Sequence, residues 1–554
     1  MAAASRAPVV RALAVAGALL LLDGSLTFGN VWPTPAIRVE WRLSVELAVL
    51  VLALAGVAIA RPAPPSRRAV GWLSALWVVL VIGHYADVTT PALYGREVNL
   101  FWDLRYVSDV AAMMLRVAAW WVVAGAIAGL VAALAVLYAG ARWAIGIVAA
   151  AMSRPRQRRV LAAGAGLVIL WFAGERLRVG SADPYLDEGS AFASPVVATY
   201  VRQARLALTS FASHSGAFTI APSPALSSDL SRLGGADVVL VFIESYGAVT
   251  YDRPAAAAAV APGRERLLAA ARETGRDVVS AFVTSPTFGG GSWLAHLSLL
   301  SGVDVRDPDT YALLMSQRAR RTLVSFFNDQ GYRTVALMPG LQQAWPEGAF
   351  YRFDELYDEL ALDYRGWAFG WWNIPDQYSL AKLDQVELAR TDRAPVFAVF
   401  PTINTHAPFS PTPPYQPDWP RVLSTNPFGQ DELEQAFDQP PDWLDLGPDY
   451  ARAIAYDLTS LAGFVRARRG RDLVVVALGD HQPPSLVSGR GAPWDVPVHI
   501  VAPPGPLRDR LIAAGFSSGV NPPRASLGPM HELGPMLLDA FGEPKPSTTP
   551  KPSS

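Results

Sequence analysis

The sequence predicts an N-terminal transmembrane domain of five helices, followed by an extracytoplasmic α/β domain with a mostly parallel central sheet covered by helices on both faces. Three observations predict this fold class. Apolar segments of nearly membrane-spanning length crowd the first third of the 554-residue chain. After residue 236, short apolar runs recur without strict alternation, which is typical of strands covered on both faces. Helical patterns separate these runs, as they do in α/β folds.

Five apolar segments are expected to cross the membrane, at residues 9–28, 43–60, 69–85, 112–139 and 160–173. The weakly apolar stretch 143–152 could add a half-helix. The first segment lacks a small-residue cleavage site at its end, so we interpret it as an anchor rather than a removed signal peptide. Dense arginine clusters, "RPAPPSRR" and "RPRQRR", precede segments three and five and mark cytoplasmic loops. The expected location is therefore the cytoplasmic (inner) membrane, multi-pass, with the large domain periplasmic or extracellular.

The expected domains are 1–178 in the membrane, a linker at 179–235, an α/β domain at 236–542 and a disordered tail at 543–554. Within the linker, "SPVVATYVRQARLALTSF" predicts either an interfacial helix or an ordinary amphipathic surface helix. A net charge of −1 gives no electrostatic case for binding nucleic acid. The absence of cysteine excludes disulfides, thiolate metal sites and a cysteine nucleophile.

Three predicted strands end in residues that can bind metals or transfer protons. Glu244 follows "DVVLVFI", Asp480 and His481 follow "LVVVALG", and His406 lies in "FPTINTH". Each placement alone has an ordinary interpretation as a cap or a turn. Because ligands in such sheets bind beyond the carboxyl ends of strands, we expect these side chains to converge. A mixed carboxylate and imidazole set suits Zn²⁺ or Mn²⁺.

A nucleophile is expected at Ser292, in "TFGGGSWLAHL". The pattern predicts that Ser292 is the N-cap of a helix, and capping alone would explain a serine there. The functional interpretation adds anion binding at the helix N-terminus and activation of the hydroxyl by a bound metal. Thr284, Ser285 and Thr287 are rival nucleophiles. The segment has neither a GxxxxGK[ST] loop nor a GxSxG elbow.

With these motifs the sequence resembles the sulfatase/alkaline-phosphatase superfamily and, within it, the membrane-bound lipoteichoic acid synthase-like phosphoglycerol transferases. "IESYG", the glycine-rich segment with Ser292, "THAPF" and "GDH" carry the resemblance. It implies one divalent metal ion, Mn²⁺ or Zn²⁺ with Mg²⁺ as a third candidate, bound by Glu244, Ser292, Asp480 and His481. It also implies that Ser292 is the nucleophile and that His406 lies near the transferred phosphate or the leaving group.

The resemblance further implies a metal-dependent phosphotransferase in the lipid bilayer. Its donor would be a membrane phospholipid, and its acceptor an extracytoplasmic glycan or polymer that receives a phosphoglycerol-type headgroup phosphate through a covalent phospho-Ser/Thr enzyme. Trp345, Tyr351 and Arg352 lie where this group binds its headgroup, although a surface aromatic cluster that closes the fold is the favoured interpretation. His296 would share a helix face with Ser292, either contacting the substrate phosphate or packing internally.

The sequence differs from the family pattern in two ways. The transferase group usually has threonine as nucleophile, whereas the candidate here is Ser292. The residues after Ser292 lack the C/S-x-P-x-R pattern that formylglycine formation requires, which disfavours sulfate-ester hydrolysis. The enzymatic alternative is a metal-dependent phosphodiesterase or phosphatase with water as acceptor. A non-catalytic receptor would be expected to have broken ligands, and a transporter to have more ionisable residues in its crossings.

Overall fold

The structure is a computed structural model that describes residues 2–61, 64–104, 107–108, 111–112, 115, 120–179, 190–213, 220, 222–317, 320–370 and 372–544. The chain divides into two compact units. Unit 1 comprises residues 1–93 and 97–211, and unit 2 comprises residues 94–96 and 212–554. Most of the predicted disordered tail, residues 545–554, lies outside the described residues, as do linker residues 180–189, 214–219 and 221.

Unit 1 is built from apolar helices. Three of them are long and apolar enough to cross a membrane, at Arg67–Tyr94, Trp120–Met152 and Pro155–Leu177, and the apolar helix Val45–Ala60 is shorter. The count of five crossings stays a prediction. The helices and strands of this unit are α1 (Ala2–Gly24), β1 (Gly29–Asn30), β2 (Ile37–Arg38), α2 (Val45–Ala60), α3 (Arg67–Tyr94), α4 (Leu100–Asp103), α6 (Trp120–Met152), α7 (Pro155–Val179) and α8 (Val196–Ser213).

Helix α6 corrects the expected boundaries of the fourth apolar segment. The sequence suggested a helix ending near Ala139 and a separate half-helix after it, but α6 continues unbroken to Met152. No proline interrupts this stretch, and Ala144, Ile145 and Val148 are fully buried in the core of unit 1. Tertiary packing therefore extends the helix past the point where hydropathy alone weakens.

Unit 2 contains a nine-stranded mixed sheet with the order β10-β4-β9-β8-β3-β7-β5-β6, and β11 also pairs with β4. The five strands from β8 to β6 are parallel, as predicted, but β9 runs antiparallel to both β8 and β4. Because β4 and β11 run in the same direction as β8, the sheet is mostly parallel, as expected, and only β9 and β10 of its described strands are reversed. The only helix that the structure describes between β8 and β9 is the four-residue α18 (Ser485–Ser488), so this connection has no long crossover helix of the kind that joins parallel strands.

The strands of unit 2 are short, and those formed by the predicted runs at residues 237, 277, 333, 396 and 473 are largely buried. Their bounds are β3 (Asp237–Ile243), β4 (Asp277–Thr284), β5 (Arg333–Leu337), β6 (Glu355–Tyr357), β7 (Val396–Pro401), β8 (Leu473–Gly479), β9 (Asp495–Ala502), β10 (Ser517–Ser518) and β11 (Ser526–Pro529).

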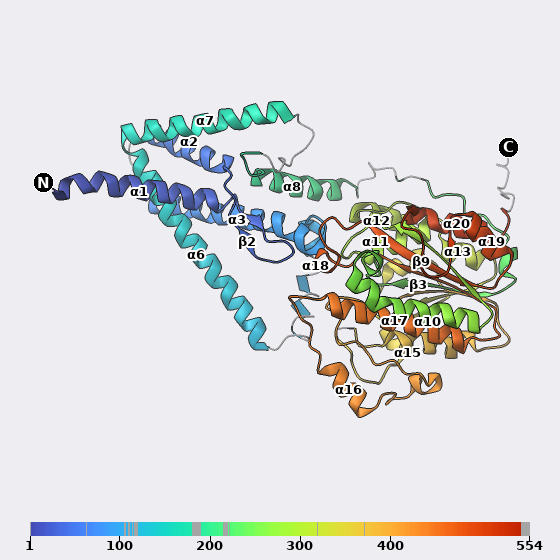
Figure 1. The fold of residues 1–554 in the computed structure, drawn as a ribbon. Coiled ribbons are helices and arrows are strands. Elements are labelled where there is room, and N and C mark those ends of the chain that lie inside the picture. The colour runs from blue at the N-terminus through green and yellow to red at the C-terminus, as the bar shows by residue number, and fades with distance from the viewer. Residues whose placement is uncertain are drawn as a thin grey trace, which may run out of the picture. The chain divides into compact units, whose positions relative to one another are not determined.

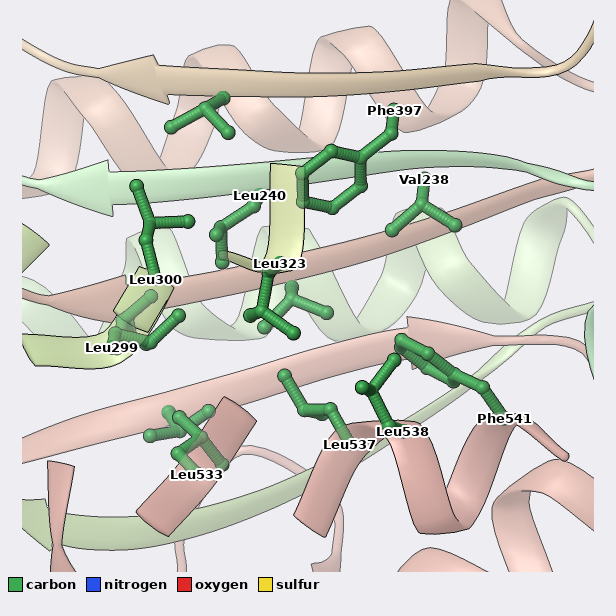
Figure 2. Close-up of a cluster of buried hydrophobic side chains, with 14 of the residues drawn as sticks. Val238, Leu240, Leu299, Leu300, Leu323, Phe397, Leu533, Leu537, Leu538 and Phe541 are labelled. Atoms are coloured by element: carbon green, nitrogen blue, oxygen red, sulfur yellow. The ribbon is translucent and has the colours of Figure 1, made fainter. Parts of the chain in front are cut away.

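Helices cover both faces of this sheet, as the sequence predicted (Figure 1). Side chains of β3 alternate between two hydrophobic clusters, with Val238 and Leu240 in one and Val239 and Val241 in the other. The first cluster is drawn in Figure 2, where Val238, Leu240 and Phe397 meet leucines of the covering helices. This alternation explains why the strand is apolar at every position.

The principal helices are named here with their bounds. They are α9 (Val249–Asp252), α10 (Pro254–Glu273), α11 (Ser292–Ser301), α12 (Pro308–Ser316), α13 (Leu323–Asp329), α14 (Glu359–Leu362), α15 (Asp376–Leu383), α16 (Gln430–Phe437), α17 (Gly447–Ala467), α19 (Pro506–Ala513) and α20 (Leu533–Phe541). Helices α10 and α17 contribute to the second cluster, and α11, α13 and α20 to the first.

Candidate metal centre and active site

The strand order places the predicted motifs at one edge of the sheet. Strand β3 lies between β7 and β8, and all three run parallel. Ile243 is in register with Gly479, so the next residues, Glu244 and Asp480, leave the sheet side by side. Phe242 is in register with Pro401, which begins the segment that carries His406. The expected convergence of strand ends is present.

Glu244, Asp480 and His481 form a buried cluster that could hold a metal ion, with one ligand atom of each within 4.8 Å of the others. The Nε2 atom of His481 lies 3.2 Å from Oε1 of Glu244 and 3.7 Å from Oδ2 of Asp480. The Nδ1 atom of His481 lies 2.7 Å from the carbonyl oxygen of Gln482, which directs Nε2 toward the cluster.

An orphaned oxygen indicates that this cluster suits a cation. Oδ1 of Asp480 accepts hydrogen bonds from the backbone N–H groups of Ser245 and His481 at 2.8 Å and 2.7 Å. Oδ2 of Asp480 is buried and has no hydrogen-bond partner among the described residues. A buried carboxylate oxygen without a partner is costly, and a metal ion would satisfy it. Two carboxylates and one imidazole fit Zn²⁺ or Mn²⁺.

In this cluster, the effect of burial on each pKa is combined with the effect of the neighbouring charged groups. Burial favours a raised pKa for Glu244, but His481 and His406 outweigh it and hold the pKa below its usual range. Burial and the nearby Glu244 carboxylate raise the pKa of Asp480 well above its usual value. Burial opposes the charged form of His481, yet Asp480 and Glu244 raise its pKa to about 9. Without metal, the cluster therefore retains protons that a divalent cation would displace.

Ser292 lies against this cluster. Its Oγ donates a hydrogen bond to Oε2 of Glu244 at 2.7 Å and lies 3.2 Å from Nε2 of His481. The expectation that Ser292 is the N-cap is wrong, because Gly291 occupies the cap and Ser292 is the first helical residue of α11. The hydroxyl is thus engaged with the cluster instead of capping the helix.

The three glycines before Ser292 adopt backbone conformations that other residues rarely adopt. Gly289, Gly290 and Gly291 have φ values of 66°, 138° and 79°, in the region that L side chains rarely adopt. A side chain at Gly289 would also collide with the carbonyl oxygen of Tyr94, 2.1 Å from the Cβ position. This tight turn delivers the N-terminus of α11 to the strand ends, which places helix amides beside the cluster.

The hydroxyls of the rival nucleophiles point elsewhere. Thr287 Oγ1 donates to the carbonyl oxygen of Gly290 at 2.6 Å, and Ser285 Oγ donates to that of Asp480 at 2.6 Å. Thr284 Oγ1 donates to Oδ1 of Asp495 at 2.9 Å. Each of these three side chains has a structural role, and among the four hydroxyls only that of Ser292 is bonded to Glu244 and His481.

The two remaining predicted histidines both contact aromatic side chains. His296 packs on Phe242 with ring centroids 4.2 Å apart, and its Nε2 lies 3.9 Å from Oδ2 of Asp480. Burial lowers the pKa of His296 to about 4, so its ring is neutral. His406 is half-buried, with Nδ1 2.8 Å from the carbonyl oxygen of Ala407 and its ring 5.7 Å from that of Trp372.

The predicted headgroup residues form a separate aromatic group. Trp345 and Tyr351 have ring centroids 5.6 Å apart, and the Tyr351 side chain is buried in the hydrophobic cluster on the first face of the sheet. Arg352 has a φ of 61° and is half exposed, 4.0 Å from Asp329. Among the contacts of the described residues, none joins these three to the metal cluster, and their binding role stays a prediction.

The sequence interpretation missed three residues around the site. Thr402 accepts a hydrogen bond from the backbone N–H of Glu244 at 3.1 Å. Ser245 has a φ of 60°, which turns the chain sharply after Glu244. Trp372 contacts the His406 ring. The position of Thr402 directly after a strand was the signal that could have found it, whereas Trp372 comes from a distant loop.

The comparisons with known proteins agree with this geometry. Residues 298–497 match the family model described as Sulfatase, and the match includes His406, Asp480 and His481. This part of unit 2 is therefore similar to the Sulfatase family. No match was found among curated proteins.

Three solved structures are similar to this chain. The chain is similar to the lipoteichoic acid synthase LtaP of Listeria monocytogenes (14% identity, 52% of this chain, 70% of that chain, TM-score 0.34). It is similar to the Streptococcus pyogenes phosphoglycerol transferase GacH in complex with sn-glycerol-1-phosphate (12% identity, 57% of this chain, 88% of that chain, TM-score 0.33). It is also similar to the integral membrane lipooligosaccharide phosphoethanolamine transferase A of Neisseria meningitidis (14% identity, 94% of this chain, 95% of that chain, TM-score 0.44).

Proposed function

We propose that this chain is a membrane-anchored, metal-dependent phosphotransferase that moves a phosphoglycerol-type headgroup phosphate from a membrane phospholipid to an extracytoplasmic glycan or polymer. The observation that carries the proposal is the Ser292 hydroxyl, 2.7 Å from Oε2 of Glu244 and 3.2 Å from Nε2 of His481 at the N-terminus of α11. A hydroxyl in this place can be deprotonated and can face a phosphorus atom.

Glu244, Asp480, His481 and Ser292 would hold the metal ion. When bound, a divalent cation supplies Lewis-acid stabilisation of phosphoryl oxygens and lowers the pKa of a serine hydroxyl. The N-terminal amides of α11 add a second source of positive potential for the phosphate. The orphaned oxygen of Asp480 and the orienting contact between His481 and Gln482 support this assignment.

In the proposed reaction, Ser292 Oγ loses its proton and forms a bond to the phosphorus of the lipid phosphodiester. The bond between phosphorus and the diacylglycerol oxygen breaks, and His406 donates a proton to that oxygen. An acceptor hydroxyl then gives its proton to His406, and its oxygen forms a bond to the phosphorus. The bond between phosphorus and Ser292 Oγ breaks, which transfers the headgroup phosphate, and Ser292 regains its proton. The apolar helices of unit 1 support a lipid donor because they would keep unit 2 at the membrane.

The test uses full-length protein with phosphatidylglycerol labelled in its headgroup, in the presence of Mn²⁺ or Zn²⁺. We expect diacylglycerol release and a phosphorylated Ser292 peptide with the wild type, and neither with Ser292→Ala. Thr287→Ala is the matched control, because its hydroxyl bonds to the backbone rather than to the cluster.

Two results would change the proposal. If Thr287→Ala abolishes turnover while Ser292→Ala does not, the nucleophile is misassigned. If labelled headgroup phosphate appears only in free solution whatever acceptor glycan is offered, water is the acceptor and the chain is a phosphodiesterase. If neither the wild type nor Ser292→Ala releases diacylglycerol although metal is bound, the donor has a different headgroup or is a soluble phosphodiester.

A further inference from the structure

Two buried carboxyl groups lie behind the segment that carries His406, and the proposed reaction does not use them. Asp376 is the first residue of α15, and Asp457 lies in the middle of α17. Both side chains are 1% exposed. The two carboxyl groups come from different helices, and each one shifts the pKa of the other.

Asp376 holds the backbone that leads to His406. Its carboxyl group accepts hydrogen bonds from the N–H of Ile403 at 3.0 Å and from the N–H of Asn404 at 2.7 Å. In return, the N–H of Asp376 donates to Oδ1 of Asn404 at 2.7 Å. Burial and the neighbouring Asp457 raise the pKa of Asp376 well above its usual value, and the backbone donors only partly oppose this rise. The turn at residues 403–406 is therefore clamped to α15.

Asp457 is linked to the metal ligand Glu244 through two hydroxyls. The backbone N–H of Glu244 donates to Thr402 Oγ1 at 3.1 Å, and this oxygen lies 3.1 Å from Thr405 Oγ1. Thr405 Oγ1 donates to Oδ2 of Asp457 at 3.4 Å. Because each hydroxyl donates only one hydrogen, the chain of bonds runs from Glu244 to Asp457, which ends it as an acceptor.

The other oxygen of Asp457 explains how two acids can be neighbours. Oδ1 of Asp457 is buried and accepts no hydrogen bond from the described residues, so it is the oxygen available to carry a proton toward Asp376. The groups acting on Asp457 are Asp376, Thr402 and Thr405, and Tyr456 of α17 also faces the pair. None of these is a cation. Burial raises the pKa of Asp457 to about 7, and two adjacent carboxylates without a cation do not both ionise.

We propose that Asp376 and Asp457 share one proton and act as a positioning pair that holds the His406 turn and the metal ligand Glu244 in fixed relation. Asp376 binds the turn through backbone N–H groups. The shared proton lies between the two carboxyl groups, while Asp457 accepts from Thr405. The inference rests on the proposed function for its effect on turnover, but its effects on stability and on metal binding do not depend on the substrate.

The test compares Asp457→Asn with Asp457→Ala in the full-length protein, with Asp449→Asn as the matched control. The asparagine side chain would keep the donor to Asp376 and the acceptor for Thr405, whereas the alanine side chain would remove both. Asp449 lies in the same helix but is paired with Arg452 at 2.9 Å. The readouts are Mn²⁺ affinity, kcat and KM for phosphatidylglycerol, and the apparent Tm from pH 5 to pH 8.

We expect Asp457→Asn and Asp449→Asn to keep Mn²⁺ affinity and kcat within about threefold of the wild type. Asp457→Ala should lower Mn²⁺ affinity or kcat by about 10–100-fold, with KM little changed, because outer-shell contacts of metal ligands have effects of this size. The folded state raises the pKa of Asp457, so wild-type stability falls as the pH rises toward and through 7. Asp457→Asn should lack this fall, and its Tm should gain about 3 °C or more on the wild type between pH 5 and pH 8.

Wild-type behaviour of Asp457→Ala in metal affinity and turnover would overturn the positioning role. Losses in Asp457→Asn equal to those in Asp457→Ala, or a Tm that falls with pH in parallel with the wild type, would overturn the shared proton. If Asp457→Ala does not fold, the Tm profile of Asp457→Asn still decides. If the wild type does not turn over phosphatidylglycerol, the proposed function fails, while the Mn²⁺ and Tm measurements continue to judge the pair.

Discussion

Glu244 is an acid at the end of a fully buried strand, where a carboxylate is expensive unless it is compensated. The compensation comes from His481 at 3.2 Å, from the hydroxyl of Ser292 and from the backbone turn held by Thr402. With two carboxylates in the cluster, the site suits a divalent cation better than a singly charged imidazolium. The residue that looked out of place in the sequence is therefore the one around which the cluster is arranged.

At this scale we predict that metal binding competes with protons. His481 must be neutral to bind a metal, and its pKa in the metal-free cluster is about 9. Mn²⁺ affinity should therefore rise by about tenfold per pH unit between pH 6 and pH 8.5, and binding should release protons. Titration calorimetry in buffers of different ionisation enthalpy measures both quantities. A flat affinity with no proton release would mean that His481 is not a ligand.

Removing the Glu244 charge should weaken the metal site far more than the fold. We predict that Glu244→Gln lowers Mn²⁺ affinity by about 100-fold or more, because a charged ligand is replaced by a neutral one. Glu273→Gln makes the same chemical change in an exposed ion pair with Arg466, and it should leave Mn²⁺ affinity unchanged. Metal content of the purified variants measures the difference, and equal metal in both would show that Glu244 is not a ligand.

The sequence could predict which residues meet because strand ends of a parallel sheet share an edge. Glu244, His406, Asp480 and His481 each follow a predicted strand, and the structure brings the three acidic and imidazole ligands of the cluster together. Contacts through distant segments could not be predicted in this way. Asp376 and Asp457 lie in helices whose approach depends on packing, and no local pattern marks them.

At the scale of elements, the end of β8 depends on a close backbone approach. A Cβ atom on Gly479 would lie 1.8 Å from the carbonyl oxygen of Tyr246 and 3.1 Å from Cβ of Val496. We predict that Gly479→Ala displaces the following residues, Asp480 and His481, and lowers Mn²⁺ affinity at least tenfold. The free energy of unfolding should fall by about 1–3 kcal/mol, as for other overpacked sites.

Gly470→Ala is the control for a glycine substitution near the same strand. Gly470 has a φ of 71° and no atom within 4 Å of its Cβ position, so only the backbone conformation opposes the methyl group. It should cost about 1 kcal/mol of stability and leave Mn²⁺ affinity intact. Denaturant unfolding and metal titration measure the two effects. Equal metal affinity in both variants would contradict the steric argument.

Elements were predictable where one interaction dominates. The buried runs that became β3, β7 and β8 are apolar on both faces, and burial alone specifies them as strands. The direction of β9 was not predictable, because a short connection without a long helix has to be recognised in three dimensions. The end of α6 was misjudged for a related reason, since packing of small residues extends it beyond the hydropathic signal.

For the whole molecule, the arginine clusters predict the orientation in the membrane, and the absence of cysteine makes the test direct. Ser66 is exposed between two apolar helices, and Ser231 is exposed in unit 2. In intact cells, a membrane-impermeant maleimide should label Ser231→Cys and should label Ser66→Cys only after permeabilisation. The reverse pattern would place the metal cluster in the cytoplasm and contradict the proposed acceptor.

The placement of β3 next to β8 has a consequence for the time at which the chain becomes active. Ser245 and Asp480 are hydrogen-bonded across a sequence separation of 235 residues. A ribosome must therefore synthesise almost all of unit 2 before Glu244 meets Asp480 and His481. Under the proposed function, an unfinished chain would have no complete site, so the strand order itself would keep the protein inactive during its synthesis.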